Sequence, residues 1–119
     1  MNHWIGQGRL GRDPQMRQAG SSQVCGFSIA CDLGKDRDPL WMTCNAWGSL
    51  GDQILKYFKQ GKPISVWGEL RPNEFTRGDN VYRDFQLTVK GWGFVNFGAP
   101  ENKENNESKE SKEEFKDPY

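Results

Sequence analysis

The spacing of apolar residues changes from a period of two to a helical period once along the chain, and then returns to a period of two. Alternation is typical of strands, in which successive side chains point to opposite faces. It predicts strands in five segments: Trp4 to Leu10, Val24 to Leu33, Leu40 to Trp47, Ile64 to Leu70 and Phe85 to Val89. The stretch from Asp13 to Ser22 contains Pro14 and Gly20 and is predicted to be a turn region.

Residues 49–61 are predicted to form a single helix. Their apolar residues recur at helical spacing and are Leu50, Ile54, Leu55 and Phe58. Ser49 is a suitable N-cap, and Gly61 followed by Pro63 predicts the end of the helix. Further on, residues 71–82 are predicted to form a long hairpin arm that turns near Gly78 and Asp79.

Two of the predicted strands have distinct inner and outer faces. In the second strand, the residues expected to face the core are Phe27, Ile29, Cys31 and Leu33. In the third strand they are Leu40, Met42, Cys44 and Ala46. The other face of the third strand carries Trp41 and Trp47 among small polar residues. Exposed indoles indicate a flat binding partner, and single-stranded nucleic-acid bases are the commonest one. The alternative is that one or both indoles cover the edge of the fold and pack on the helix.

The order β-β-β-α-β-β predicts a mainly β protein with the OB fold, a five-stranded Greek-key barrel with one helix between the third and fourth strands. We expect this domain to span residues 1–98, followed by a flexible acidic tail at residues 99–119. The domain carries 12 Lys and Arg against 9 Asp and Glu, and the tail carries 4 against 7, so a net charge of zero divides into +3 and −3. This asymmetry favours a nucleic-acid partner.

Composition argues against several other classes of protein. No apolar run approaches the roughly 18 residues of a membrane span and no signal-like leader opens the chain, so we expect a cytoplasmic protein without membrane contact. Cys25, Cys31 and Cys44 form no CxxC pair and are predicted to be buried free thiols, with no metal and no cofactor. With one histidine and no recognisable catalytic set, we do not expect an enzyme.

Two short motifs are misleading. Gly6, Gly8 and Gly11 match the dinucleotide-binding fingerprint, but only five residues precede them and no helix is predicted after them. Arg77-Gly78-Asp79 spells a cell-adhesion tripeptide, which we interpret as the turn of the hairpin arm.

Several short segments, in the same order, resemble bacterial and phage single-stranded DNA-binding proteins over roughly residues 4–97. They are Gly8 to Pro14, Trp41, Trp47-Gly48, Leu55 to Gly61, Gly68 to Arg71, and Phe75 to Asp79 leading to Tyr82. The resemblance implies sequence-independent binding of single-stranded DNA in replication, recombination and repair, with bases stacked on Trp41, Trp47 and Phe75. It also implies a homo-oligomer, either a dimer or a tetramer.

Two features depart from that family. The loop Gly34 to Pro39 is short and lacks a tryptophan that many members carry there. The tail is also short, and it finishes with Asp117-Pro118-Tyr119 where family tails commonly have an acidic run, Pro and Phe. By resemblance, this tip is the expected docking site for replication and repair proteins, in the bacterial cytoplasm or nucleoid or in the host cytoplasm of a phage.

Basic and aromatic residues near the tryptophans are expected to complete the DNA site. The candidates are Arg71, Arg77 and Tyr82 on the arm, and Lys35 and Arg37 in the charged loop. The alternatives are a solvated hairpin, and a loop whose lysine and arginine are neutralised by Asp36 and Asp38. Trp67 either lines the same groove or lies in a subunit contact, whereas Trp4 and Trp92 are expected in the core or an interface.

Two other functions remain possible from the sequence. One is an OB module that binds a protein partner, for example a nuclease accessory. The other is an RNA-binding protein of the cold-shock type, which needs aromatic residues on the second and third strands. The outer face of the second strand carries Ser28, Ala30 and Asp32 instead, which argues against the cold-shock type.

Overall fold

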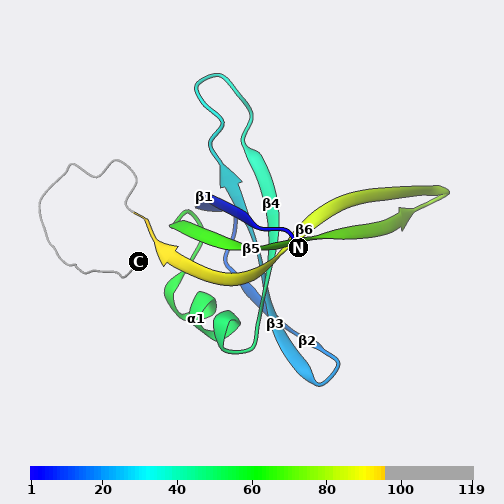
Figure 1. Ribbon diagram of the computed structural model, residues 1–119, viewed down its shortest axis with the longest axis horizontal. Helices are drawn as coiled ribbons and strands as arrows, with labels where there is room; N and C mark the ends of the chain where they lie inside the picture. Colours follow the sequence, from blue (N-terminus) through cyan, green and yellow to red (C-terminus); the bar gives the residue numbers. More distant parts are fainter. Residues whose placement is uncertain (96–119) are drawn as a thin grey trace, which may run out of the picture.

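The computed structural model describes residues 1–95, which form six strands and one helix (Figure 1). The strands are β1 Trp4–Leu10, β2 Gln15–Ala19, β3 Ser22–Cys31, β4 Leu40–Trp47, β5 Pro63–Arg77 and β6 Asn80–Phe94. The helix α1, Ser49–Tyr57, lies between β4 and β5. No helix in this part of the chain is long and apolar enough to cross a membrane.

Five of the strands close into a barrel. The sheet order is β1-β5-β6-β4-β3-β2, and β1 closes the ring because it pairs with β5 along most of its length and with β3 through Arg9 and Leu10. Neighbouring strands are antiparallel except for β4 and β6, which run parallel. This closed arrangement with one helix is the OB fold, as the sequence predicted.

The barrel core follows the predicted alternation along β3 and β4. Its buried residues from these two strands include Phe27, Ile29, Cys31, Met42, Cys44 and Ala46. The predictions for Leu33 and Leu40 were wrong, because these side chains are 49% and 42% exposed. The strand β3 ends at Cys31 and β4 begins at Leu40, so both leucines lie at the rim, beyond the layers of side chains that fill the barrel.

The segment before β3 is a strand rather than a turn region. Residues Gln15–Ala19 form β2, which pairs with β3 as a hairpin through a two-residue turn at Gly20 and Ser21. The prediction failed because β2 lies outside the closed ring, so most of its side chains face solvent and give no apolar alternation. Met16 is its partly buried side chain that packs against the core.

Both ends of α1 differ from the prediction. Gly48, with a φ of 61°, is the N-cap, and Ser49 is the first helical residue, with no side-chain capping hydrogen bond at this end. The helix stops at Tyr57 because Phe58 turns into extended backbone and buries its ring in the core. Gly61, with a φ of 85°, belongs to the turn that follows. The Ser49 cap and the Gly61 stop were therefore wrong, although the helix itself was correctly predicted.

The ends of β5 and β6 form the predicted arm, which projects from the barrel (Figure 1). Arg77 pairs with Asn80, so the turn consists of Gly78 and Asp79, and Gly78 has a φ of 61°. This confirms the predicted turn. The predictions for the tail at residues 99–119 and for its tip lie outside the described residues.

Candidate nucleic-acid interface

The strand β4 presents two tryptophans on the outer face of the barrel. Met42, Cys44 and Ala46 are buried, whereas Trp41 and Trp47 are 57% and 43% exposed. The predicted faces of this strand are therefore correct. Trp47 follows Trp41 by six positions, and a rise of about 3.3 Å per residue places the two indoles roughly 20 Å apart along β4. They form two distinct sites for stacking, too far apart to hold one base between them.

Trp41 lies against the backbone that follows β1. A Cβ atom at Gly11 would lie 2.7 Å from Cζ3 of the Trp41 ring, so only glycine leaves room for the indole in this position. The Gly11 N–H donates to the Ser28 carbonyl oxygen at 3.0 Å, which fixes this segment against β3. Gly11 therefore helps to set the position of the exposed ring, a role that the sequence pattern did not reveal.

A hollow of about 570 Å³ has two arginines in its walls and lies next to Trp41, which does not line it but pairs with a residue that does. Ala30 lines it and pairs directly with both Arg9 on β1 and Trp41 on β4. Arg37 reaches it from the loop between β3 and β4, and Asp32 supplies a carboxylate. This end of β4 thus combines an exposed indole with guanidinium groups.

The loop that carries Arg37 is held by two hydrogen bonds that its backbone N–H groups donate. The Gly34 N–H donates to Asp32 Oδ1 at 2.8 Å, and the Arg37 N–H donates to the Gly34 carbonyl oxygen at 3.3 Å. The sequence predicted both Lys35 and Arg37 as site residues. The structure brings Arg37 to the hollow, whereas Lys35 is exposed on the loop and does not line it.

A second hollow, of about 520 Å³, lies beside Trp47 at the other end of β4. Its walls include Arg17 from β2 and Arg71 from β5, and its polar floor includes Asn45 and Gln86. The Asn45 Nδ2 donates to Gln86 Oε1 at 2.9 Å, which links β4 to β6 across the floor. Two cations and an indole therefore surround a hydrogen-bonding surface.

Arg17 is a residue that the sequence interpretation missed. It pairs directly with Val24, which in turn pairs with Trp47, so the three side chains share one row across β2, β3 and β4. Val24 is completely buried although it belongs to the outer face, as expected for a small side chain flanked by two large ones. The two-residue turn at Gly20 and Ser21 before an alternating strand was the signal for this hairpin.

Arg71 is partly paired with a carboxylate. Its Nη2 lies 3.3 Å from Glu69 Oε1, and the two side chains are 62% and 39% exposed. Such a solvated pair contributes little to stability. Arg71 still lines the hollow, and its other N–H groups can contact a phosphate.

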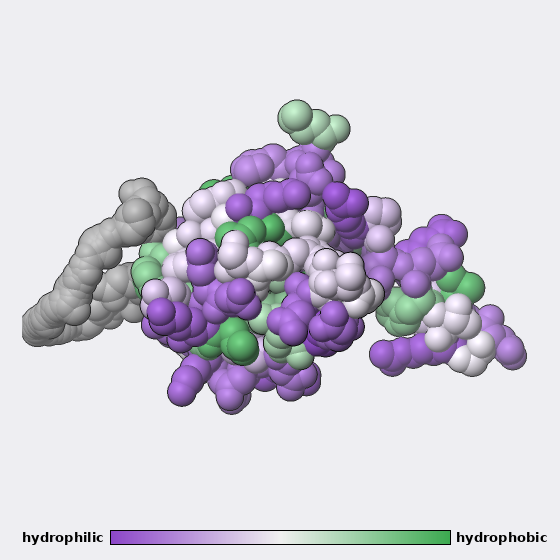
Figure 2. All heavy atoms as spheres, turned by 90° about the horizontal axis from the view of Figure 1, so that it is seen from below, coloured by the Kyte–Doolittle hydropathy of each residue, from purple (hydrophilic) through white to green (hydrophobic). Residues whose placement is uncertain are grey.

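The arm continues this surface away from the barrel. Phe75 and Tyr82 are direct partners and stack with ring centroids 5.6 Å apart, and the Arg77 Cζ lies 5.5 Å from the Phe75 centroid. By strand alternation, Arg71, Phe75 and Arg77 share one face. Figure 2 shows the arm standing apart from the body, with apolar side chains among strongly hydrophilic ones. The predicted arm residues are thus brought together.

Trp67 lies elsewhere. Trp67 pairs with Gly91 and Gly68 pairs with Val89, so Lys90 is an extra residue in β6 at this point, and the Trp67 indole lies over Gly91, where a Cβ would overlap the ring. It lines neither of the hollows beside Trp41 and Trp47. Trp4 and Trp92 pack against the core, in agreement with their expected place.

Comparison with known proteins identifies the family of this chain. The model of the single-strand binding protein family matches residues 1–94. A single-stranded DNA-binding protein of Clostridium perfringens is 28% identical over 102 residues, which cover 82% of this chain and 68% of that protein. One of Staphylococcus epidermidis is 22% identical over 108 residues, covering 87% and 80%. Single-stranded DNA-binding protein 1 of Chlorobaculum tepidum is 33% identical over 86 residues, covering 63% and 53%. The chain therefore belongs to the single-strand binding protein family.

Proposed function

We propose that this protein binds single-stranded DNA without sequence preference and protects it, without catalysis, during replication, recombination and repair. The observation that carries the proposal is the pair of exposed indoles on β4, each beside a hollow lined by two arginines. Stacking is tolerant of sequence because every base has a π face, and each stacked base contributes about 1–3 kcal/mol. The relatives of Clostridium perfringens and Staphylococcus epidermidis are named single-stranded DNA-binding proteins.

The proposed path of the strand follows the outer face of the barrel. Arg9 and Arg37 would contact phosphates beside the base on Trp41, and Arg17 and Arg71 beside the base on Trp47. Phe75, Arg77 and Tyr82 would extend the contacts along the arm. The placement of cations next to rings supports neutralisation of the backbone together with stacking of the bases.

A fluorescence titration tests this function. Oligo-dT should quench tryptophan emission near stoichiometric protein, and a duplex of equal length should produce a much smaller change because its bases are already stacked. The Trp41→Phe and Trp47→Phe variants separate the two indoles, since each removes one reporter but keeps a ring. An OB module that binds only a protein partner would leave the emission unchanged with both nucleic acids, and this result would reject the proposal.

We also propose that the protein acts as a homo-oligomer. Within the described residues, β1 pairs with β3 only through Arg9 and Leu10, so the edge of β1 from Trp4 to Gly8 that faces away from β5 has no strand partner. Ile5 is 63% exposed and pairs directly with Trp67, which places an apolar pair on the outer surface. An open edge beside apolar side chains is suited to pairing with a second copy. Mass measurement with and without oligo-dT distinguishes monomer, dimer and tetramer.

The docking role of the tail tip remains part of the proposal. Asp117 and Tyr119 combine a carboxylate with a ring, and by family resemblance they would bind replication or repair proteins. A pull-down that compares the full chain with the Asp117→Asn and Tyr119→Ala variants tests it. Equal recovery of such partners by all three would remove this role. The cytoplasmic location likewise stays a prediction from the sequence.

A further inference from the structure

Two carboxamide side chains form the floor of the hollow beside Trp47. The Asn45 Nδ2 donates to Gln86 Oε1 at 2.9 Å, and both residues are half-buried. Within residues 1–95, this is the one hydrogen bond of either side chain. The Asn45 Oδ1 atom and the Gln86 Nε2 group therefore remain available, as an acceptor and a donor, at the bottom of a hollow of about 520 Å³.

The floor is open on the β3 side because a glycine lies there. Gly26 is the direct partner of Asn45 and has no side chain to cover its amide. A Cβ atom at Gly26 would lie 3.0 Å from Arg17 Nη1 and 3.9 Å from Asn45 Oδ1, so the space above this glycine borders both the guanidinium and the amide. A ligand that enters the hollow here meets the amide directly.

A base stacked on Trp47 would stand over this floor. Trp47 lies two residues beyond Asn45 on β4, so both side chains leave the same face of the strand, roughly 7 Å apart. Side chains of strands stand approximately perpendicular to the sheet. A base whose ring centre lies about 4.5–7 Å from that of the indole would therefore turn one edge down toward Asn45 and Gln86. Stacking on the ring and hydrogen bonding to the floor are compatible in one position of the base.

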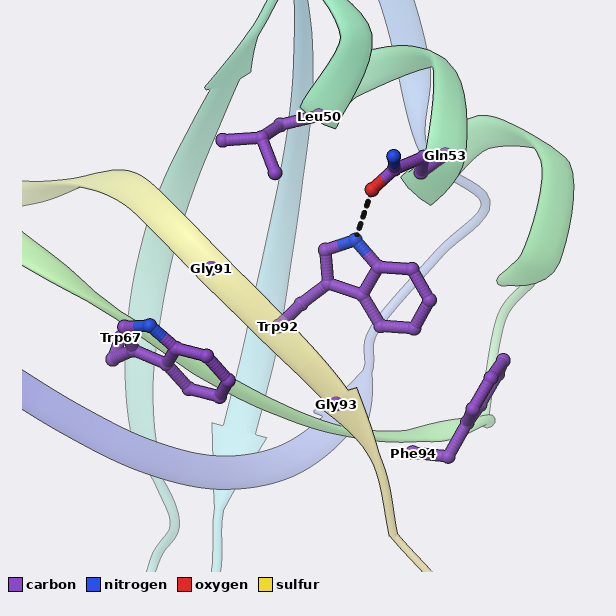
Figure 3. Close-up of a pocket in the computed structure, with 7 residues that line it drawn as sticks. All are labelled: Leu50, Gln53, Trp67, Gly91, Trp92, Gly93 and Phe94. Atoms are coloured by element: carbon purple, nitrogen blue, oxygen red, sulfur yellow. Dashed lines mark hydrogen bonds between the residues drawn. The ribbon is translucent and has the colours of Figure 1, made fainter. Parts of the chain in front are cut away.

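The two carboxamides can exchange the roles of donor and acceptor. Each carries an oxygen acceptor and an NH2 donor, and rotation about its terminal torsion, which is roughly two-fold, interchanges them. When both amides turn over, Gln86 Nε2 donates to Asn45 Oδ1, and the free groups become Asn45 Nδ2 and Gln86 Oε1. The Gln53 carboxamide differs, because it accepts from Trp92 Nε1 at 2.8 Å and an indole N–H can only donate (Figure 3). The orientation of Gln53 is fixed by its partner, whereas that of the Asn45–Gln86 pair is not.

We propose that Asn45 and Gln86 hydrogen-bond the edge of the base stacked on Trp47, and that the pair turns over to match that base. This inference rests on the proposed binding of single-stranded DNA. Cytosine and adenine present an amino donor beside a ring-nitrogen acceptor, whereas thymine presents a ring N–H donor between two carbonyl acceptors. A pair that turns over can satisfy each of these edges. It would strengthen binding through the bases without selecting a sequence.

Fixing the pair in one orientation should create a base preference. In Gln86→Glu, the carboxylate at neutral pH can only accept, and it favours amino groups such as that of cytosine. In fluorescence titrations with oligonucleotides of equal length, the ratio of the affinity for oligo-dC to that for oligo-dT should rise about 2- to 10-fold above the wild-type ratio. The added negative charge weakens binding to both oligonucleotides and cancels in this ratio. Asn45→Asp places a carboxylate in the same floor and should change the ratio in the same direction.

Gln18→Glu is the matched control. It introduces the same charge on β2, at an exposed residue that lines neither the hollow beside Trp41 nor the one beside Trp47, so the ratio should keep its wild-type value. An equal rise in this control would show an effect of charge alone and would overturn the proposal.

An unchanged ratio in folded Gln86→Glu would also overturn the proposal. If the amide pair only ties β4 to β6, the substitution would lower the free energy of unfolding and leave the ratio as it is. Should circular dichroism show that Gln86→Glu is unfolded, the ratio measured for Asn45→Asp decides. Failure of the wild-type protein to bind either oligonucleotide would instead reject the proposed DNA binding, so the two failures are distinguishable.

Discussion

Replacing Arg17 by glutamine isolates one cation of the proposed DNA interface. Arg17 is exposed on β2, lines the hollow beside Trp47 and makes no salt bridge within the described residues. Glutamine keeps a polar side chain that can still flank Val24 but removes the charge. We therefore expect little change in the free energy of unfolding and a specific change in the salt dependence of DNA binding.

The size of that change follows from counterion release. For single strands, the slope of log K against log salt is about −0.7 for each phosphate contact, so the loss of one contact should make the slope shallower by about 0.7. When salt is raised from 50 mM to 200 mM, the affinity of both proteins for DNA should fall. The factor by which it falls should be about 2.6 times smaller for Arg17→Gln than for the wild-type protein. The preference among oligonucleotides of different composition should not change, because Arg17 would contact phosphate only.

Fluorescence titration with oligo-dT at several salt concentrations measures this slope. Arg83→Gln is the matched control, because Arg83 pairs with Glu74 at 2.9 Å and lies on the face of the arm opposite to Phe75. Its slope should equal that of the wild-type protein. An unchanged slope in Arg17→Gln, or an equal change in both variants, would refute the assignment of the hollow beside Trp47 to the DNA path.

Three further predictions concern the rings and the core. Trp41→Ala and Trp47→Ala should each weaken oligo-dT binding by about 1–3 kcal/mol, or roughly 5- to 150-fold, in titrations, while circular dichroism shows a folded barrel; unfolding instead would make the indoles structural. Gly11→Val should weaken binding about as much as Trp41→Ala, because a Cβ displaces the ring; wild-type affinity would contradict this. Burial raises the pKa of the Cys44 thiol. Since the unfolded thiol ionises near pH 8.5, its contribution to stability should be complete below that pH and fall above it, as urea unfolding of the wild-type protein and Cys44→Ala can show.

Much of the barrel was predictable because strand faces are a local property. Alternation placed Met42, Cys44 and Ala46 in the core and Trp41 and Trp47 outside, and the structure confirms this. The turn at Gly78 and Asp79 was equally local, since two residues between strands need a positive φ that glycine supplies. These features depend on neighbours in sequence and needed no knowledge of the packing.

The ends of elements were less predictable because packing decides where they stop. Phe58 matched the helical spacing, yet it leaves the helix to bury its ring, and α1 ends at Tyr57. Leu33 and Leu40 continued the alternation, yet they lie beyond the closed barrel and are exposed. In each case the local pattern was correct, and the boundary of the core overrode it.

By itself, the sequence determined the mainly β fold, the single helix, the family resemblance and the outward position of the two tryptophans on β4. The tertiary structure alone decided which cations meet them. Arg17 joins Trp47 and Arg71 because β2 pairs with β3 and the barrel closes around β4 and β6. Trp67 covers Gly91 of β6 and lines neither of their hollows. A face is set by the period of one strand, whereas a site on a barrel is set by the register between strands that are distant in sequence.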